Sequence, residues 1–94
     1  MSVVGLLSVQ FHIPDARSLK DKRMVLRRVK DRLKKFNVSV AETDHQDLWQ
    51  RARLDIVAVS TTTVAVDQAL AAVATEIERI EPGTVSAIHV EFLS

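Results

Sequence analysis

The sequence contains no cysteine, only two prolines and two glycines, and 4% aromatic residues. Without cysteine there can be no disulfide, thiolate metal site, thiol redox centre or cysteine nucleophile. No apolar run approaches about 20 residues, the length that crosses a bilayer. The N-terminal MSVVGLLSVQ also lacks the basic region and cleavage site of a secretion signal. We therefore expect a cytoplasmic protein that makes no contact with membranes.

The remaining composition is that of one small folded domain. The chain has 94 residues, of which 47% are hydrophobic and 27% are charged, the balance of an ordinary globular protein. This length leaves no room for a second core, so we expect residues 1–94 to form a single domain.

Charge is distributed very unevenly, although the net charge is only +1. Residues 17–35 carry ten basic and two acidic residues, a net charge of +8. The rest of the chain carries three basic and ten acidic residues, a net charge of −7. The sequence thus predicts a bipolar molecule whose basic end lies in one segment.

Hydrophobic periodicity predicts six elements. Apolar residues alternate with polar ones in 3–13, 38–41, 49–60 and 85–93, which is typical of half-buried strands. Apolar residues recur every three or four positions in 18–36, after Ser18 as N-cap, and again after the threonines at 61–63. The order strand, helix, strand, strand, helix, strand predicts an α+β, ferredoxin-like βαββαβ sandwich. In it, two helices cover one face of a four-stranded antiparallel sheet.

Three stretches together resemble the YlxP family of small bacterial cytosolic proteins. They are SLKDKR at 18–23, NVSVAE at 37–42 and DHQDLWQR at 44–51. The resemblance covers nearly the whole chain and implies a ferredoxin-like fold, a cytoplasmic setting and no established enzymatic activity. It brings no catalytic residues and no cofactor, so we expect a protein that is not an enzyme.

The basic segment is the main candidate for a binding surface. Cations around an exposed helix can lie along an RNA phosphate backbone, which predicts an accessory factor that contacts RNA or the ribosome. The alternative is a structural or protein-binding module, whose cations pair with acidic residues of the same chain or of a partner. The candidate contacts are Arg17, Lys20, Lys22, Arg23, Arg27, Arg28, Lys30, Arg32, Lys34 and Lys35.

Two functions known for this topology fit the residues less well. The central strands direct no aromatic residue outward, so we do not expect bases to stack on the sheet as they do in RNA-recognition motifs. An acylphosphatase-like enzyme would use Arg17 for phosphate and Asn37 for water. The loop before Arg17 contains Pro14 and no glycine, so it cannot easily turn its N–H groups toward a phosphate. We identify no small-molecule substrate.

The predicted hairpin turn is acidic and is followed by the single tryptophan. Glu42, Asp44, His45 and Asp47 could bind a divalent cation, or they could satisfy the backbone of an ordinary turn. The sequence leaves this open and predicts no metal. Trp49 is either an anchor for a partner or a cap on the core, with equal support.

An apolar patch is expected on the sheet face that no helix covers. Val4 and Leu6 of the first strand and Val57 and Val59 of the third share the outward parity. Such a patch would face water unless a second surface covered it. The pattern therefore predicts a homodimer formed through these four residues, with pairing of edge strands as an alternative or addition.

Overall fold

A computed structural model describes all residues from 1 to 94 and contains the six predicted elements in the predicted order. The elements are β1 (Val3–His12), α1 (Leu19–Leu33), β2 (Ser39–Asp44), β3 (Arg51–Ser60), α2 (Thr63–Ile80) and β4 (Val85–Phe92). Neither helix is long and apolar enough to span a bilayer.

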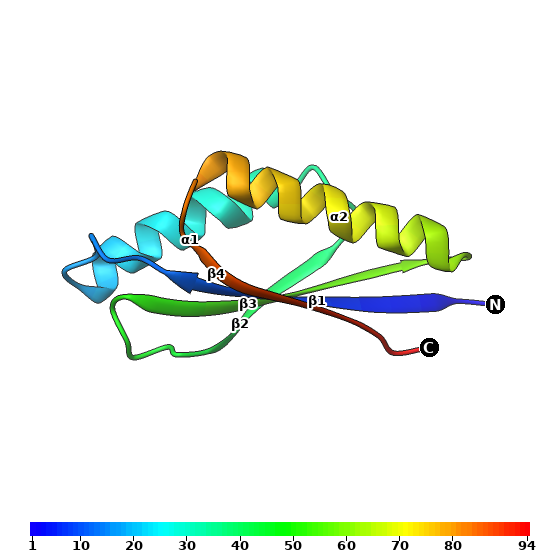
Figure 1. Ribbon diagram of the computed structural model, residues 1–94, viewed down its shortest axis with the longest axis horizontal. Coiled ribbons are helices and arrows are strands. Elements are labelled where there is room, and N and C mark those ends of the chain that lie inside the picture. The colour runs from blue at the N-terminus through cyan, green and yellow to red at the C-terminus, as the bar shows by residue number, and fades with distance from the viewer.

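The four strands form one antiparallel sheet in the order β2-β3-β1-β4. Both helices lie on the same side of this sheet, and both chain ends lie at the same end of it (Figure 1). This is the ferredoxin-like arrangement, which confirms the predicted fold class. We call the side without helices the open face.

The core lies between the sheet and the helices. Along β1 and β3 the buried residues alternate with more exposed ones, because successive side chains of a strand point to opposite faces. The helices contribute residues three or four positions apart. The largest buried apolar side chains are Leu7, Val9, Phe11, Val29, Leu33, Leu54, Ile56, Val66, Leu70, Val73 and Ile77.

Side-chain caps begin both helices as the sequence predicts. The hydroxyl of Ser18 accepts a hydrogen bond from the N–H of Asp21, and the hydroxyl of Thr62 accepts one from Ala65. The end of α1 differs from the prediction, since the helix stops at Leu33 instead of Phe36. There the N–H of Lys34 donates to the carbonyl of Asp31, three residues back, so the last turn tightens and ends the helix.

The third strand also begins later than predicted, at Arg51 instead of Trp49. His45, in the turn before it, has a φ of 62°, and its N–H bonds the carboxylate of Asp44. Such a left-handed residue reverses the chain, and Asp and Asn commonly support it with their side chains. The turn therefore extends further along the chain than the alternation of apolar residues indicates.

Gly5 allows α2 to lie close to the sheet. A Cβ atom at this position would be 2.5 Å from Cγ1 of Val66 and 3.1 Å from Cδ1 of Leu70, both on α2. Neither neighbour has open space to move into, since Val66 is fully buried and Leu70 is 1% exposed. The absence of a side chain at Gly5 therefore sets the distance between α2 and β1.

Candidate nucleic-acid interface

The cations of the basic segment, residues 17–35, divide into those that pair within the chain and those that do not. Lys22, Arg28, Lys34 and Lys35 each lie within 4.0 Å of a carboxylate. The other six predicted contacts have no ion pair: Arg17, Lys20, Arg23, Arg27, Lys30 and Arg32. The intramolecular pairing considered from the sequence thus applies to only part of the basic segment.

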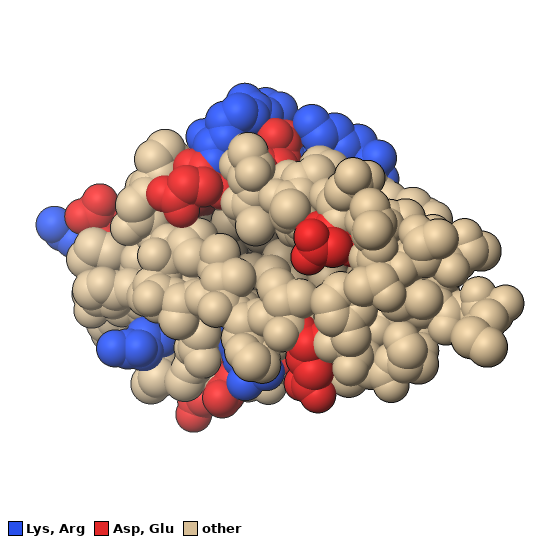
Figure 2. Space-filling model, turned by 45° about the vertical axis from the view of Figure 1, so that its right-hand side comes forward, with Lys and Arg blue, Asp and Glu red and all other residues tan.

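The unpaired cations include a row along one flank of α1. Arg23, Arg27 and Lys30 are four and three residues apart, a spacing that places them on the same side of the helix. With Lys34 they line a groove of about 330 Å³, whose other wall includes Glu42 of β2. In the space-filling view, most visible Lys and Arg side chains gather at the top, on the helix side of the molecule (Figure 2).

Lys22 does not belong to this surface, and its prediction as an outward contact is wrong. Its residue exposure is 1%. The ammonium group donates to the carbonyls of His45 at 2.7 Å, Gln46 at 3.3 Å and Arg51 at 3.2 Å, and lies 3.3 Å from Oε2 of Glu42. Lys22 therefore fastens α1 to the turn between β2 and β3.

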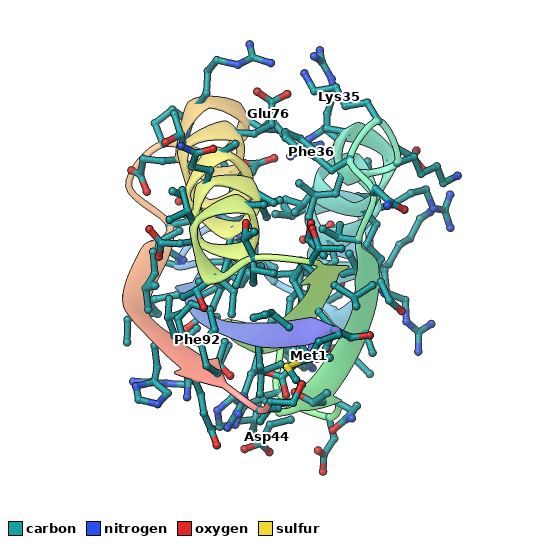
Figure 3. The ribbon with its side chains drawn as sticks, turned by 90° about the vertical axis from the view of Figure 1, so that its right-hand side faces the viewer. Met1, Lys35, Phe36, Asp44, Glu76 and Phe92 are labelled. Atoms are coloured by element: carbon teal, nitrogen blue, oxygen red, sulfur yellow. The ribbon has the colours of Figure 1, made fainter.

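Arg28 and Lys35 face α2 and link the two helices. The guanidinium of Arg28 lies 2.7 Å from Oε1 of Glu81, and the ammonium of Lys35 lies 2.9 Å from Oε2 of Glu76. Lys35 and Glu76 point toward each other across the top of the helix layer (Figure 3). These two cations are committed to carboxylates of the same chain.

Glu76 accepts from two cations at once, which shifts its titration. Nε and Nη2 of Arg79 each donate to it at 2.9 Å. Hydrogen bonds from Arg79 and then Lys35 stabilise the ionised carboxylate and lower its pKa from 4.5 to about 2.

This shift predicts a loss of stability in acid that depends on Glu76. A carboxylate with a lowered pKa stabilises the fold above its unfolded pKa and loses that contribution as the pH falls toward its folded pKa. We expect E76Q to unfold at a lower temperature than the wild type at pH 7, and the two melting temperatures to converge as the pH falls from 4.5 to about 2. Thermal unfolding followed by circular dichroism across this range measures it. A difference that stays constant with pH would contradict the assignment.

The acidic turn does not assemble a metal site. Glu42 points to the helix side, where it meets Lys22, and the Nε2 atom of His45 lies 3.2 Å from Gln10. No group of three or more His, Asp or Glu side chains is arranged to hold a metal ion. Asp44 instead accepts from the N–H of His45, and His45 lies beside Gln10 of β1.

The open face has a polar centre and an apolar end. Nε of Arg53 lies 3.0 Å from the carboxylate of Asp55, and its Nη2 donates to Ser8 at 3.1 Å. Burial alone would raise the pKa of Asp55, but hydrogen bonds from Arg53, Ser8 and Thr43 outweigh it and lower the pKa. The strands carry no aromatic side chain toward this face, in agreement with the sequence.

The apolar end holds the four residues expected in a dimer interface. Val4, Leu6 and Val57 are half-buried, and Val59 is 54% exposed. They lie on neighbouring strands, since Val4 pairs with Val59 and Leu6 with Val57. The predicted patch is thus contiguous, and its covering by a second copy stays a prediction.

Trp49 does not cap the core, because it is 52% exposed. It lines a hollow of about 480 Å³ at the end of the sheet, together with His12, Asp47, Leu48, Gln50 and Arg51. The exposure of Trp49 contradicts the capping role, and contact with a partner stays a prediction.

Two comparisons identify the family. The model of a family described as "Protein of unknown function (DUF503)" matches residues 4–90. The uncharacterized protein YlxP of Bacillus subtilis (strain 168) is 44% identical over 69 residues, which are 72% of this chain and 75% of the relative. The chain belongs to the DUF503 family. The resemblance to YlxP seen in the sequence is thereby confirmed.

Solved structures resembling this DUF503 protein include designed and natural chains. The designed protein Foldit4 has a TM-score of 0.62 at 10% identity, covering 100% of this chain and 98% of its own. The designed protein Ferredog-Diesel has a TM-score of 0.59 at 15% identity, with 94% and 83% covered. A C-terminal segment of the alpha subunit of aIF2 from Pyrococcus abyssi has a TM-score of 0.55 at 22% identity, with 97% and 49% covered. At these identities the likeness concerns the fold alone.

Proposed function

We propose that this DUF503 protein binds the phosphate backbone of RNA through the groove flank of α1, the side of the helix that carries Arg23, Arg27 and Lys30 and lines the groove. The observation that carries the proposal is the row Arg23, Arg27 and Lys30, whose members have no carboxylate partner in the chain. When lysine and arginine side chains neutralise phosphates, the small cations condensed on the RNA are released into solution. This release drives association.

The contrast between the two flanks of α1 supports this proposal. On the flank toward α2, Arg28 and Lys35 meet Glu81 and Glu76. On the groove flank, the nearest acidic groups are Asp31, which pairs with Lys34, and Glu42, which pairs with Lys22. The like charges on this flank repel each other unless an external anion lies between them.

Binding through this flank would depend little on base sequence. Phosphate contacts position a nucleic acid but carry no sequence information, and the open face presents no aromatic platform for bases. The proposed function is thus an accessory contact to RNA, such as ribosomal RNA, in the cytoplasm. It involves no chemical step and no cofactor.

The test is a salt titration with the row removed. We expect the wild type to bind labelled ribosomal RNA fragments and an oligouridylate of equal length with similar affinity. The triple variant R23Q/R27Q/K30Q should bind at least about tenfold more weakly, and its log–log salt slope should be smaller by about 2, which corresponds to three lost phosphate contacts on a single strand.

A control of equal charge separates a specific row from net charge. The variant R28Q/K35Q/R79Q removes three cations that already pair with Glu76 and Glu81. This variant should retain RNA affinity within about threefold, because the charges of these cations are already neutralised by carboxylates of the same chain. No detectable binding by the wild type at low salt, or equal losses in both variants, would refute the proposed row.

A further inference from the structure

The edge strand β4 carries three large apolar side chains that the fold leaves partly uncovered. Ile88 is 49% exposed, Val90 41% and Phe92 42%. They pair with Val9, Leu7 and Gly5 of β1, which face the helices, so all three lie on the helix side of the sheet. Figure 3 shows Phe92 at the margin of the sheet, below α2.

The position of α2 explains this exposure. Among the strands, α2 packs on β1 and β3. At the start of β4, Val85 packs against the core, and near the end of the strand the ring of Phe92 lies close to Gly5. The helix side of β4 therefore extends beyond the cover that one chain supplies.

The other edge strand, β2, is protected in a way that β4 is not. Its register shifts between Glu42 and Asp44, and both of these residues are acidic. Irregular register and charges are features that keep an edge from pairing with another chain. In β4 the only charged residue is Glu91, there is no lysine or proline, and the register shift lies at its start, opposite Gln10 and Phe11.

The backbone of β4 offers free hydrogen-bonding groups at these same apolar residues. The N–H of Leu93 donates to Val4 of β1, and the N–H of Ile13, directly after β1, points the other way, to Gln50. Because direction alternates along a strand, residues 89 and 91 bond β1. The N–H and C=O groups of Ile88, Val90 and Phe92 then point to the unpaired edge.

We propose that two copies of this chain pair antiparallel through β4, in place of the open-face contact that the sequence predicts, with the two-fold axis passing beside Val90. In this register Val90 faces Val90 of the second copy, and Ile88 faces Phe92 of the second copy. On the opposite side of the strands, His89 faces Glu91 of the second copy. That pair occupies a position without backbone hydrogen bonds, where side chains approach most closely.

The other symmetric registers are less complementary. An axis at Glu91 sets two carboxylates opposite each other, and an axis at His89 sets Glu91 opposite Ala87. An axis at Ile88 sets Val90 opposite Ser86 and Phe92 opposite Thr84. Like charges opposite each other and unmatched apolar side chains both destabilise a strand pair. The axis at Val90 alone matches all three apolar residues and the polar pair.

This pairing also covers the exposed row. Antiparallel strands joined at their edges keep the same face up, so both α2 helices lie on the same side of a continuous sheet. They then flank the joined β4 strands and shield Ile88, Val90 and Phe92 of both copies from water. The two α1 helices lie at the outer ends, so the RNA proposal neither requires nor excludes this dimer.

Three exposed valines provide the experiment. Val90 lies on the β4 edge, Val59 on the open face at 54% exposure, and Val64 on α2 at 65% exposure. By sedimentation equilibrium at about 50 μM, above the micromolar dissociation constants of weak specific interfaces, we expect the wild type to have twice the mass of one 10.5 kDa chain. V90K should be monomeric, whereas V64K and V59K should remain dimeric, all with the circular dichroism of the wild type.

Exchanging the polar pair tests the register. H89E and E91H should each weaken dimerisation by at least about threefold, since each sets like groups opposite each other. The double variant H89E/E91H should recover most of the loss, because it restores a carboxylate opposite an imidazole. The recovery of dimerisation in H89E/E91H can be measured whether or not V90K folds. A monomeric wild type, a dimeric V90K or additive losses in the double variant would overturn the proposal, and dissociation by V59K would move the interface to the open face.

Discussion

Replacing Lys22 by methionine is expected to lower the free energy of unfolding by about 3–5 kcal/mol, the cost of removing one partner from a buried ion pair. Methionine has a similar length and keeps the apolar contacts of the stem. It leaves three carbonyls without their hydrogen-bond donor and Glu42 without its cation, in a site where Lys22 is 1% exposed. Urea unfolding followed by circular dichroism measures the loss.

Two controls separate the buried ammonium group from other effects. K20M changes an exposed lysine on the same helix and should shift stability by less than about 0.5 kcal/mol. In the E42Q background, K22M should cost less than in the wild type, because no unpaired carboxylate remains. Equal losses of stability in K22M and K20M would show that the contacts of Lys22 with the β2–β3 turn do not stabilise the fold.

Replacing Gly5 by alanine is expected to destabilise the protein by about 2 kcal/mol, within the range of overpacked cores. The new methyl group would lie 2.5 Å from Cγ1 of Val66, so α2 or the strand must move. The effect should largely disappear when Val66 is shortened: G5A/V66A should be more stable than the sum of the two single changes predicts. Chemical unfolding of all four proteins completes this cycle.

Gly83 supplies a contrast for the same experiment. Its φ is 75°, and a Cβ there would have nothing within 4 Å. G83A should therefore cost about 1 kcal/mol through backbone conformation alone and show no coupling to V66A. Coupling between Gly83 and Val66, or additivity between Gly5 and Val66, would contradict the spatial argument.

The sequence predicts the fold well because each element has a strong period. Leu54, Ile56 and Ala58 alternate with less buried neighbours, and all three are buried as expected. The ends of elements are less predictable. The stop of α1 at Leu33 and the late start of β3 at Arg51 depend on turn hydrogen bonds that hydrophobic period does not report.

The burial of Lys22 is predictable in part from the sequence. Lys22 lies four residues before Leu26, seven before Val29 and eleven before Leu33, which is the spacing of the buried stripe itself. Its position on that stripe is visible in the sequence. The three carbonyls that accept its hydrogen bonds are not, because they belong to the turn before β3 and to the first residue of β3, more than twenty residues away.

Other features of the candidate surfaces depend on tertiary placement. The partners of Arg28 and Lys35 are Glu81 and Glu76, which only the packing of α2 on α1 brings near. The alternation in β4 predicts that Ile88, Val90 and Phe92 face the helices, but their exposure depends on how far α2 extends sideways. The period of the sequence indicates which face of the sheet a side chain points to, but it does not indicate whether a helix covers that side chain.

The separation of charge has a consequence for how fast a polyanion is captured. The molecule measures only 21 and 18 Å across its shorter directions, and ten of its twelve carboxylates lie outside the basic segment at residues 17–35. At physiological ionic strength, electrostatic influence decays over about 8 Å. A strand approaching the row of Arg23, Arg27 and Lys30 then senses these cations and the groove carboxylates Asp31 and Glu42, but little of the acidic charge on the sheet. At 0.01 M salt the decay length is about 30 Å and exceeds the thickness of the protein, so that the strand senses nearly the whole net charge of +1. Association should therefore accelerate as salt is lowered from physiological levels and then level off, where a uniformly basic protein would continue to accelerate.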